Sequence, residues 1–210
     1  MKTLIPLALL AMLLVPLRAA EEISFGAESL VDKGWVNNGG IDATVVTDEG
    51  KQVQEFKDED ESKFCQYTLM VPADQILELG DRGFVLEARI KQLSNSSEIF
   101  VFLKSLGVFG IGIWRDPATG KVSVSSWDEA QGKFHSANVP GAEEYFTLKA
   151  VFEPGKELVV TINGEPGYSF PVETAVHSNY NMIQIGNRLA DRQFHTLIES
   201  FRFGPAGGQP

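Results

Sequence analysis

Apolar residues that recur at every second position, in short runs, constrain the fold of this chain more than any other feature. Such runs occupy residues 84–91, 146–152 and 158–162, and Gly, Pro, Asn and Asp bound them. This alternation is typical of strands with one buried and one wet face. The one helical candidate is a brief turn over residues 73–79, after Pro72. The chain is therefore predicted to be all-β.

Two of these runs face each other across a short turn at residues 153–156, which predicts a hairpin, and Asn163-Gly164 signals a second turn directly after it. Many evenly spaced strands without crossover helices imply an antiparallel sandwich of two sheets, for which a jelly roll is the usual topology at this size. The expected core comprises Phe84, Leu86, Ile90, Leu148, Ala150, Val160 and Ile162.

The first twenty residues have the layout of a secretory signal. Lys2 supplies the positive start, an apolar stretch follows to Leu17, and Ala19-Ala20 precede acidic residues. No later segment offers the ~20 consecutive apolar residues of a transmembrane helix, so no anchor is expected. The predicted organisation is a signal peptide at 1–20, one β-sandwich at 21–204 and a flexible tail at 205–210. The protein is expected to be secreted or periplasmic.

Net charge restricts the class of expected partners, and cysteine content shows how the fold can be stabilised. The formal net charge is −10, and loss of Lys2 and Arg18 with the signal peptide lowers it to about −12. Nucleic acid, which selects basic patches, is therefore not an expected partner. Cys65 is the only cysteine, so no internal disulfide can form, and its apolar surroundings predict a buried, inert thiol. We expect a monomer that is stabilised by its hydrophobic core.

Three segments carry a resemblance to a known family. They are residues 83–91, residues 145–165 with their central hairpin and Asn-Gly turn, and residues 183–203 at the end of the domain. Together they resemble the concanavalin A-like lectin and glucanase superfamily in its laminin-G-like jelly-roll branch. The resemblance implies a glycan or polysaccharide as the ligand. It leaves open whether the chain binds or cleaves it, because that superfamily includes lectins, glycoside hydrolases and polysaccharide lyases.

The absence of a known catalytic motif argues against cleavage of the glycan. Retaining glycosidases of this fold carry Glu-x-Asp-x-x-Glu, which sets two carboxylates ~5 Å apart, and the sequence contains no such spacing. A non-catalytic, lectin-like module is therefore the favoured function. A glycosidase or lyase with an unrecognised site, and a structural or protein-interaction domain of the cell surface, stay open as alternatives.

The candidate binding surface is a hairpin that carries two tryptophans. If Asp116 pairs with Lys121 across the turn at 117–120, Ile113 faces Val124 on one side of the hairpin. The other side then carries Trp114 and Trp127, with Ser123, Ser125 and glycines between them. Indole rings stack on the C–H faces of sugars and small polar residues bond hydroxyl groups, so this side suits a glycan. Alternatively, both tryptophans pack under a loop or along the sandwich edge.

Four charged residues complete the candidate set. Glu87 and Arg89 are expected on the same wet face as the tryptophans, or else as ordinary solvated strand residues. No other cofactor is expected, but calcium is common in lectins of the resembled superfamily, where loop carboxylates bind it. Asp116 and Asp128, which flank the hairpin segments, are the candidate calcium ligands. The alternative for Asp116 is a role in the turn alone.

Overall fold

The computed structural model describes residues 22–58, 63–104, 106–141, 143–172, 179–187 and 194–207. The predicted signal peptide lies outside these residues. Within them the regular secondary structure is nearly all antiparallel strand, as the alternation predicted. The elements are β1 (Ile23–Phe25), β2 (Val36–Asn37), β3 (Thr44–Asp48), β4 (Lys51–Asp58), β5 (Gln66–Met70), α1 (Ala73–Arg82), β6 (Phe84–Leu103), β7 (Gly107–Arg115), β8 (Val122–Asp128), β9 (Lys133–Val139), β10 (Phe146–Phe152), β11 (Glu157–Ile162), β12 (Glu165–Pro171), β13 (Met182–Gly186) and β14 (Phe194–Pro205).

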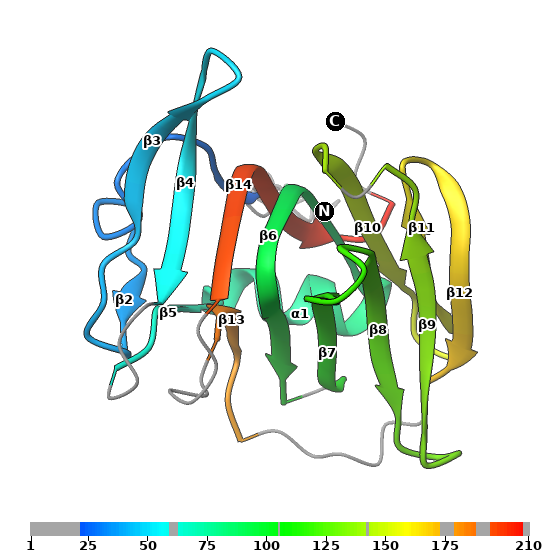
Figure 1. Cartoon of the computed structure of the whole chain (residues 1–210). Coiled ribbons are helices and arrows are strands. Elements are labelled where there is room, and N and C mark those ends of the chain that lie inside the picture. Colours follow the sequence, from blue (N-terminus) through cyan, green and yellow to red (C-terminus); the bar gives the residue numbers. More distant parts are fainter. Residues whose placement is uncertain are drawn as a thin grey trace, which may run out of the picture.

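The strands form a sandwich of two layers (Figure 1). In the layer that we call sheet A the order is β3-β4-β14-β6-β10-β11-β12, with β1 added to the end of β14. In sheet B the order is β2-β5-β13-β6-β7-β8-β9. All of these pairings are antiparallel. The structure thus confirms the two-sheet antiparallel prediction.

Strand β6 belongs to both sheets. Its first half pairs with β14 as far as Ser94, and its second half pairs with β7 from Asn95 onward. Asn95 has a φ of 47°, in the left-handed region that asparagine tolerates. The buried Gln92 side chain donates to the Ser94 and Asn95 carbonyls, and its oxygen accepts hydrogen bonds from Ser97 and Thr196. These bonds satisfy a polar group inside the core at the point where β6 changes sheets.

Inward-facing apolar residues of both sheets form one core. All seven residues that the alternation assigned to the core are at most 4% exposed. The hairpin of β10 and β11 pairs Leu148 with Ile162, and the next turn places Asn163 and Gly164 at positive φ, as their residue types predicted. Cys65 is fully buried, and burial raises the pKa of its thiol to about 12. The expectation of an inert thiol is thus supported.

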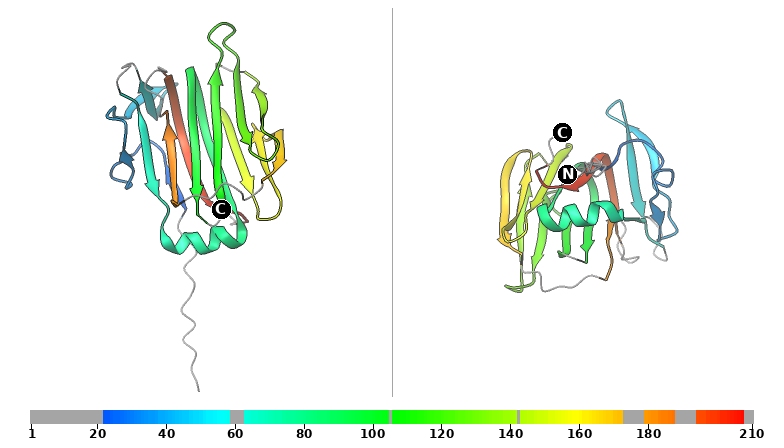
Figure 2. Two further views of the ribbon diagram at one scale, coloured as in Figure 1. Left: turned by 90° about the horizontal axis from the view of Figure 1, so that it is seen from below. Right: turned by 180° about the vertical axis from the view of Figure 1, so that it is seen from behind.

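Two sequence expectations need correction. The helix α1 is longer than a brief turn, and it lies across one end of the sandwich (Figure 2). The predicted flexible tail begins too early, because Ala206 is 4% exposed and its carbonyl accepts a 2.7 Å hydrogen bond from Arg82 Nε. Residues 208–210 lie outside the described chain. The cause is the docking of α1, which holds the end of β14.

Candidate functional site

The β7–β8 hairpin has the register that the sequence predicted. Ile113 pairs with Val124, and Trp114 pairs with Ser123. The Asp116 amide donates a 2.9 Å hydrogen bond to the Lys121 carbonyl, which closes the turn. Ile113 and Val124 are buried in the core. Because side chains alternate along strands, Trp114 must lie on the outer face of sheet B.

Both tryptophans are exposed. Trp114 and Trp127 each have 47% of their surface accessible, so neither packs under a loop or into the core. Trp127 is also held in place. Its Nε1 donates a 2.7 Å hydrogen bond to Glu129, and its ring packs edge to face on Phe134 with ring centroids 4.9 Å apart. A large aromatic side chain that is exposed yet restrained loses little conformational freedom on binding, which favours a role as a contact residue.

The outer face of sheet B extends beyond the two tryptophans. Phe100 and Phe102 on β6 stack on each other with ring centroids 5.7 Å apart, and Phe134 on β9 is 67% exposed. Sequence reasoning missed these three aromatic residues. The signal was present for two of them, because Phe100 and Phe102 alternate with Ile99 and Val101, which are buried.

The ladders arrange these side chains in rows that cross the strands. The small-residue row, Gly112, Ser125 and Ser136, runs from β7 to β9. The aromatic row lies two residues farther along the strands, where Phe100 pairs with Gly110 and Trp127 pairs with Phe134. On the other side is the Trp114 row, where Ser96, Trp114, Ser123 and Asn138 are paired in turn. Successive rows are ~7 Å apart, given the rise per strand residue.

Two glycines shape the floor between these rows. A Cβ on Gly110 would lie 2.6 Å from the Phe100 ring, so this ring occupies the space over the glycine. A Cβ on Gly112 would meet only ordinary contacts, the nearest being Ser125 Oγ at 3.5 Å. The small-residue row therefore carries little side-chain bulk between the aromatic side chains, which leaves room for a ligand that stacks on rings and bonds to hydroxyl groups.

Behind the aromatic row, the β8–β9 hairpin is fixed from the inner side. Asp128 is buried, and its carboxylate accepts hydrogen bonds from His135 Nε2 at 3.0 Å and from the Gln131 amide at 3.1 Å. Burial raises the pKa of Asp128, but these hydrogen bonds outweigh it and leave the pKa below its ordinary value. The His135 ring stacks on Phe170 of β12 at 4.6 Å. The hairpin that carries Trp127 and Phe134 is thus tied to sheet A.

Glu87 and Arg89 do not share this face. They lie in the first half of β6, on the outer face of sheet A, because β6 changes sheets before it reaches the tryptophan hairpin. Arg89 Nε donates to Glu199 at 2.8 Å, and Glu87 accepts a 2.9 Å hydrogen bond from Arg202. Both line a groove of about 380 Å³ together with Thr147 and residues of β1.

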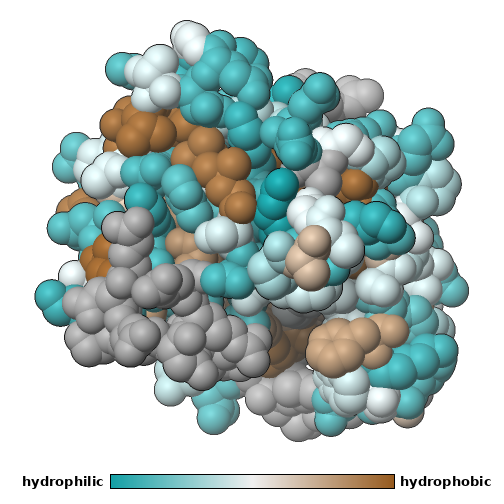
Figure 3. All heavy atoms as spheres, in the orientation of Figure 1, coloured by the Kyte–Doolittle hydropathy of each residue, from teal (hydrophilic) through white to brown (hydrophobic). Residues whose placement is uncertain are grey.

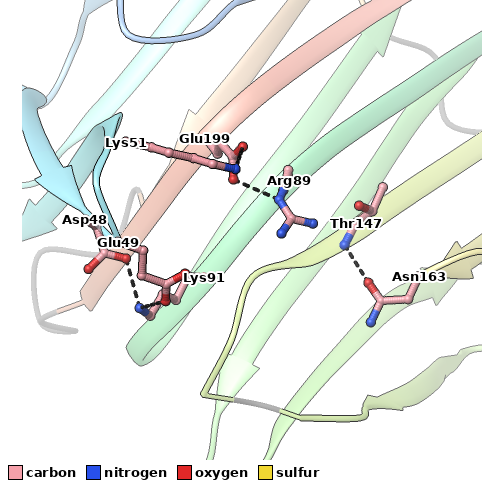
Figure 4. A network of polar contacts seen from close by, with 8 residues as sticks. All are labelled: Asp48, Glu49, Lys51, Arg89, Lys91, Thr147, Asn163 and Glu199. Atoms are coloured by element: carbon pink, nitrogen blue, oxygen red, sulfur yellow. Dashed lines mark hydrogen bonds and ion pairs between the residues drawn. The ribbon is translucent and has the colours of Figure 1, made fainter.

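A network of ion pairs continues across sheet A (Figure 4). Lys91 bridges Asp48 and Glu49 at the tip of the β3–β4 hairpin, at 2.9 Å each, and Lys51 contacts Glu199 at 2.6 Å. The hydrogen bond from Lys91 lowers the pKa of Asp48. In the space-filling view, hydrophilic residues surround separate apolar groups, one of them over β3 and β4 (Figure 3). This network fixes the hairpin to the sheet.

Asp116 and Asp128 do not form a shared calcium site. Asp116 lies in the turn before β8 and Asp128 ends that strand, so the length of β8 separates them. The carboxylate of Asp116 accepts hydrogen bonds from the Ala118 amide and the Thr119 hydroxyl, which lower its pKa and stabilise the turn. The described residues contain no group of three or more His, Cys, Asp or Glu side chains placed to hold a metal ion.

Comparison with known proteins gives a likeness in structure alone. No protein-family model matches the chain, and no curated protein matches its sequence. A solved structure of the carbohydrate esterase vb_24B_21 from the Shiga toxin-encoding bacteriophage phi24B matches with a TM-score of 0.66 and 16% identity, over 87% of this chain and 97% of that one. The fold is a jelly-roll-like β-sandwich.

Two toxin structures match as well. The binding domain of botulinum neurotoxin DC, solved in complex with rat synaptotagmin II, has a TM-score of 0.59 and 11% identity over 87% of this chain and 47% of that one. A structure of botulinum neurotoxin type C, whose cell entry depends on interaction with two ganglioside molecules, has a TM-score of 0.53 and 14% identity, over 88% and 43%. This chain spans less than half the length of these two chains.

Among the described residues, no helix combines the length and the apolar character that a bilayer crossing requires.

Proposed function

We propose that this chain is an exported, non-catalytic glycan-binding module, and that its binding surface is the outer face of sheet B. The observation that carries the proposal is the exposure of Trp114 and Trp127 on one sheet face, with Gly112 and Ser125 between them. An apolar ring beside hydroxyl groups matches the two chemical surfaces of a sugar. The solved structures that share the fold include a carbohydrate esterase and a toxin that interacts with gangliosides, which is compatible with this function.

Four strands, β6 to β9, contribute to the surface. At the usual spacing between strands, the rows that cross them are ~14 Å long. A surface of that length accommodates several sugar units of a chain better than one terminal ring. We therefore propose an oligosaccharide or polysaccharide as the ligand, bound across the strands along the small-residue row.

The finer classification is also a proposal. We place the chain in the laminin-G-like branch of the concanavalin A-like superfamily on the three sequence segments that resemble it.

We further propose that residues 1–20 are a cleaved signal peptide and that the protein is secreted or periplasmic. N-terminal sequencing of the exported protein should give a start near Glu21; an exported chain that still begins at Met1 would contradict this.

The binding function is tested by affinity electrophoresis of residues 21–210 through gels that contain individual polysaccharides. Retardation by at least one polysaccharide is expected. Reducing ends are assayed in parallel, and no release is expected from the retained polymer. Retardation by none of a broad panel would reject glycan binding, and released reducing ends would show that the chain is an enzyme instead.

A further inference from the structure

Strands β7 and β8 are paired over only part of their length. Their ladder joins residues 112–115 to residues 122–125, and within the continuously described range 106–141 it does not extend to residues 107–111 and 126–128. Over the remaining length β7 pairs with β6 and β8 pairs with β9, each on its other side. Two strand edges without a ladder partner therefore face each other beside Trp127.

Between these edges lies a cleft of about 40 Å³, which we call the β7–β8 cleft. Its lining includes Trp127 and Ala130, which are exposed, and Leu158 and Phe170, which are at most 5% exposed. The cleft therefore leads from the aromatic row of the proposed binding surface toward the core between the sheets.

The size of the cleft limits the group that can enter it. A water-sized group needs ~10–15 Å³ of such a cavity, so the cleft holds about three non-hydrogen atoms. A sugar ring is too large for this space, whereas a small substituent of the ring, of the size of an acetyl group, fits.

The walls offer two kinds of contact to such a substituent. A strand points its backbone N–H and C=O groups to one side at every second residue, so the two facing edges present donors and acceptors. Leu158 and Phe170 present apolar surface. An acetamido group carries an N–H donor, a C=O acceptor and a methyl group, and therefore matches both kinds of contact.

Charge argues against acidic substituents of a sugar ring. Among the described residues that line the cleft, the ionisable ones are Asp128 and Glu129. Both carboxylates are engaged within the protein, Asp128 with His135 and Glu129 with the indole N–H of Trp127. A carboxylate or sulfate of a ligand would meet like charge and no cation in this lining, so the cleft favours an uncharged group.

From the size, the walls and the charge of the cleft we infer that it takes the acetamido group of an N-acetylated sugar whose ring stacks on Trp127. The inference rests on the proposed glycan binding and adds the class of sugar. Trp127 lines the cleft and also belongs to the aromatic row, so a sugar on its indole lies next to the cleft. The ligand is thus a glycan that contains N-acetylhexosamine units.

The test compares two oligosaccharides of the same linkage and length. Chitohexaose carries an acetamido group on each ring where cellohexaose carries a hydroxyl group. In isothermal titration, residues 21–210 should bind chitohexaose at least tenfold more tightly, within the ~10–200-fold range that a small group in a fitting pocket contributes.

A second measurement is local to the cleft. In nitrogen-15 NMR spectra the backbone amides of Gly110 and Ser126, which line the cleft from β7 and β8, should shift further with chitohexaose than with cellohexaose. A preference for chitohexaose without this difference would place its acetamido groups elsewhere and overturn the assignment of the cleft.

The variant Val108→Phe enlarges a half-buried side chain that lines the cleft. It should lower the preference for chitohexaose at least fivefold. The matched control is Val159→Phe, which makes the same change at a 42% exposed position of β11 outside the cleft and should leave the preference unchanged. Thermal melts establish that both variants are folded, and if Val108→Phe is not, the two measurements on the wild-type protein decide.

The outcomes separate the two proposals. If neither hexasaccharide binds and no polysaccharide retards the protein in affinity electrophoresis, the proposed function and the inference are both rejected. If a polysaccharide retards the protein but chitohexaose binds no more tightly than cellohexaose, or not at all, glycan binding stands and the inference is overturned. Equal effects of Val108→Phe and Val159→Phe on the preference would overturn the role of the cleft.

Discussion

Three tryptophans occupy two different environments in this chain. Trp35 is 2% exposed and packs edge to face on Phe25 and Phe201, whereas Trp114 and Trp127 stand on the surface of sheet B. The sequence predicted exposure of Trp114 and Trp127 through the hairpin register. Local pattern gives no comparable signal for Trp35, because Phe201 of β14, on which this indole packs, is distant from it in the sequence.

Replacement of Trp114 or Trp127 by alanine should weaken binding without unfolding the protein. Aromatic contact residues typically contribute ~1–3 kcal/mol to binding, and a side chain that is half exposed leaves no cavity when it is removed. Isothermal titration with a bound polysaccharide gives the affinity, and thermal melts give the stability. Unchanged affinity, or a large fall in melting temperature, would contradict the assignment of the platform.

Gly112, the glycine of the small-residue row, is a second position at which the binding surface can be tested. Gly112→Val should add bulk between the aromatic side chains and reduce affinity at least tenfold, while the fold tolerates it because a Cβ meets only Ser125 at ordinary distance. Gly204→Val is the matched control: it lies on β14 in sheet A, where a Cβ would be 3.7 Å from Glu22. Loss of binding in both variants, or in neither, would argue against ligand contact at Gly112.

At the scale of single elements, the β8–β9 hairpin depends on Asp128. Its folded pKa lies below the ordinary value, so it stabilises the fold above the unfolded pKa of ~3.9, and this contribution is lost as the pH falls through the folded pKa. In Asp128→Asn the fall in melting temperature below about pH 4 should be smaller than in the wild type. Asp32→Asn, in the exposed turn before β2, is the control.

Amide hydrogen exchange measures the stability of the β8–β9 hairpin directly. In Asp128→Asn, amide exchange should rise in β8 and β9 more than in β10 and β11. If the melting temperatures of the wild type and Asp128→Asn depend on pH in the same way, the carboxylate contributes nothing to the hairpin.

Strand β6 explains why two of the six predicted binding residues, Glu87 and Arg89, lie elsewhere. Alternation over residues 84–91 assigned the right face to each residue of this segment. It carried no information that the strand continues to Leu103, or that it passes from sheet A to sheet B at Ser94 and Asn95. Glu87 and Arg89 therefore lie on the opposite outer face from Trp114. The hydrogen bonds of Gln92 and the contacts of β14, distant in sequence, decide that change of sheet.

For the whole molecule, the fold class and the core residues followed from the alternation of apolar residues, since buried apolar positions alternate in nearly every long strand. Strand order did not follow, because it depends on pairings such as β1 with β14 that join the two ends of the domain. The core around these ends gives a prediction: Trp35→Ala should destabilise the fold by ~3–5 kcal/mol, as expected for a fully buried indole. Denaturant unfolding measures it, and a loss below 1 kcal/mol would contradict the described packing.

The central claim is that glycan binds to the outer face of sheet B, and the three tryptophans allow one direct measurement of it. In nitrogen-15 NMR spectra each indole N–H gives its own signal, so a titration of the folded chain with a polysaccharide that it binds reports on the outer face of sheet B and on the core at once. We predict that the signals of Trp114 and Trp127 shift or broaden while that of Trp35 does not. Binding that leaves Trp114 and Trp127 unperturbed, with changes confined to backbone amides around Glu87 and Arg89, would contradict the account.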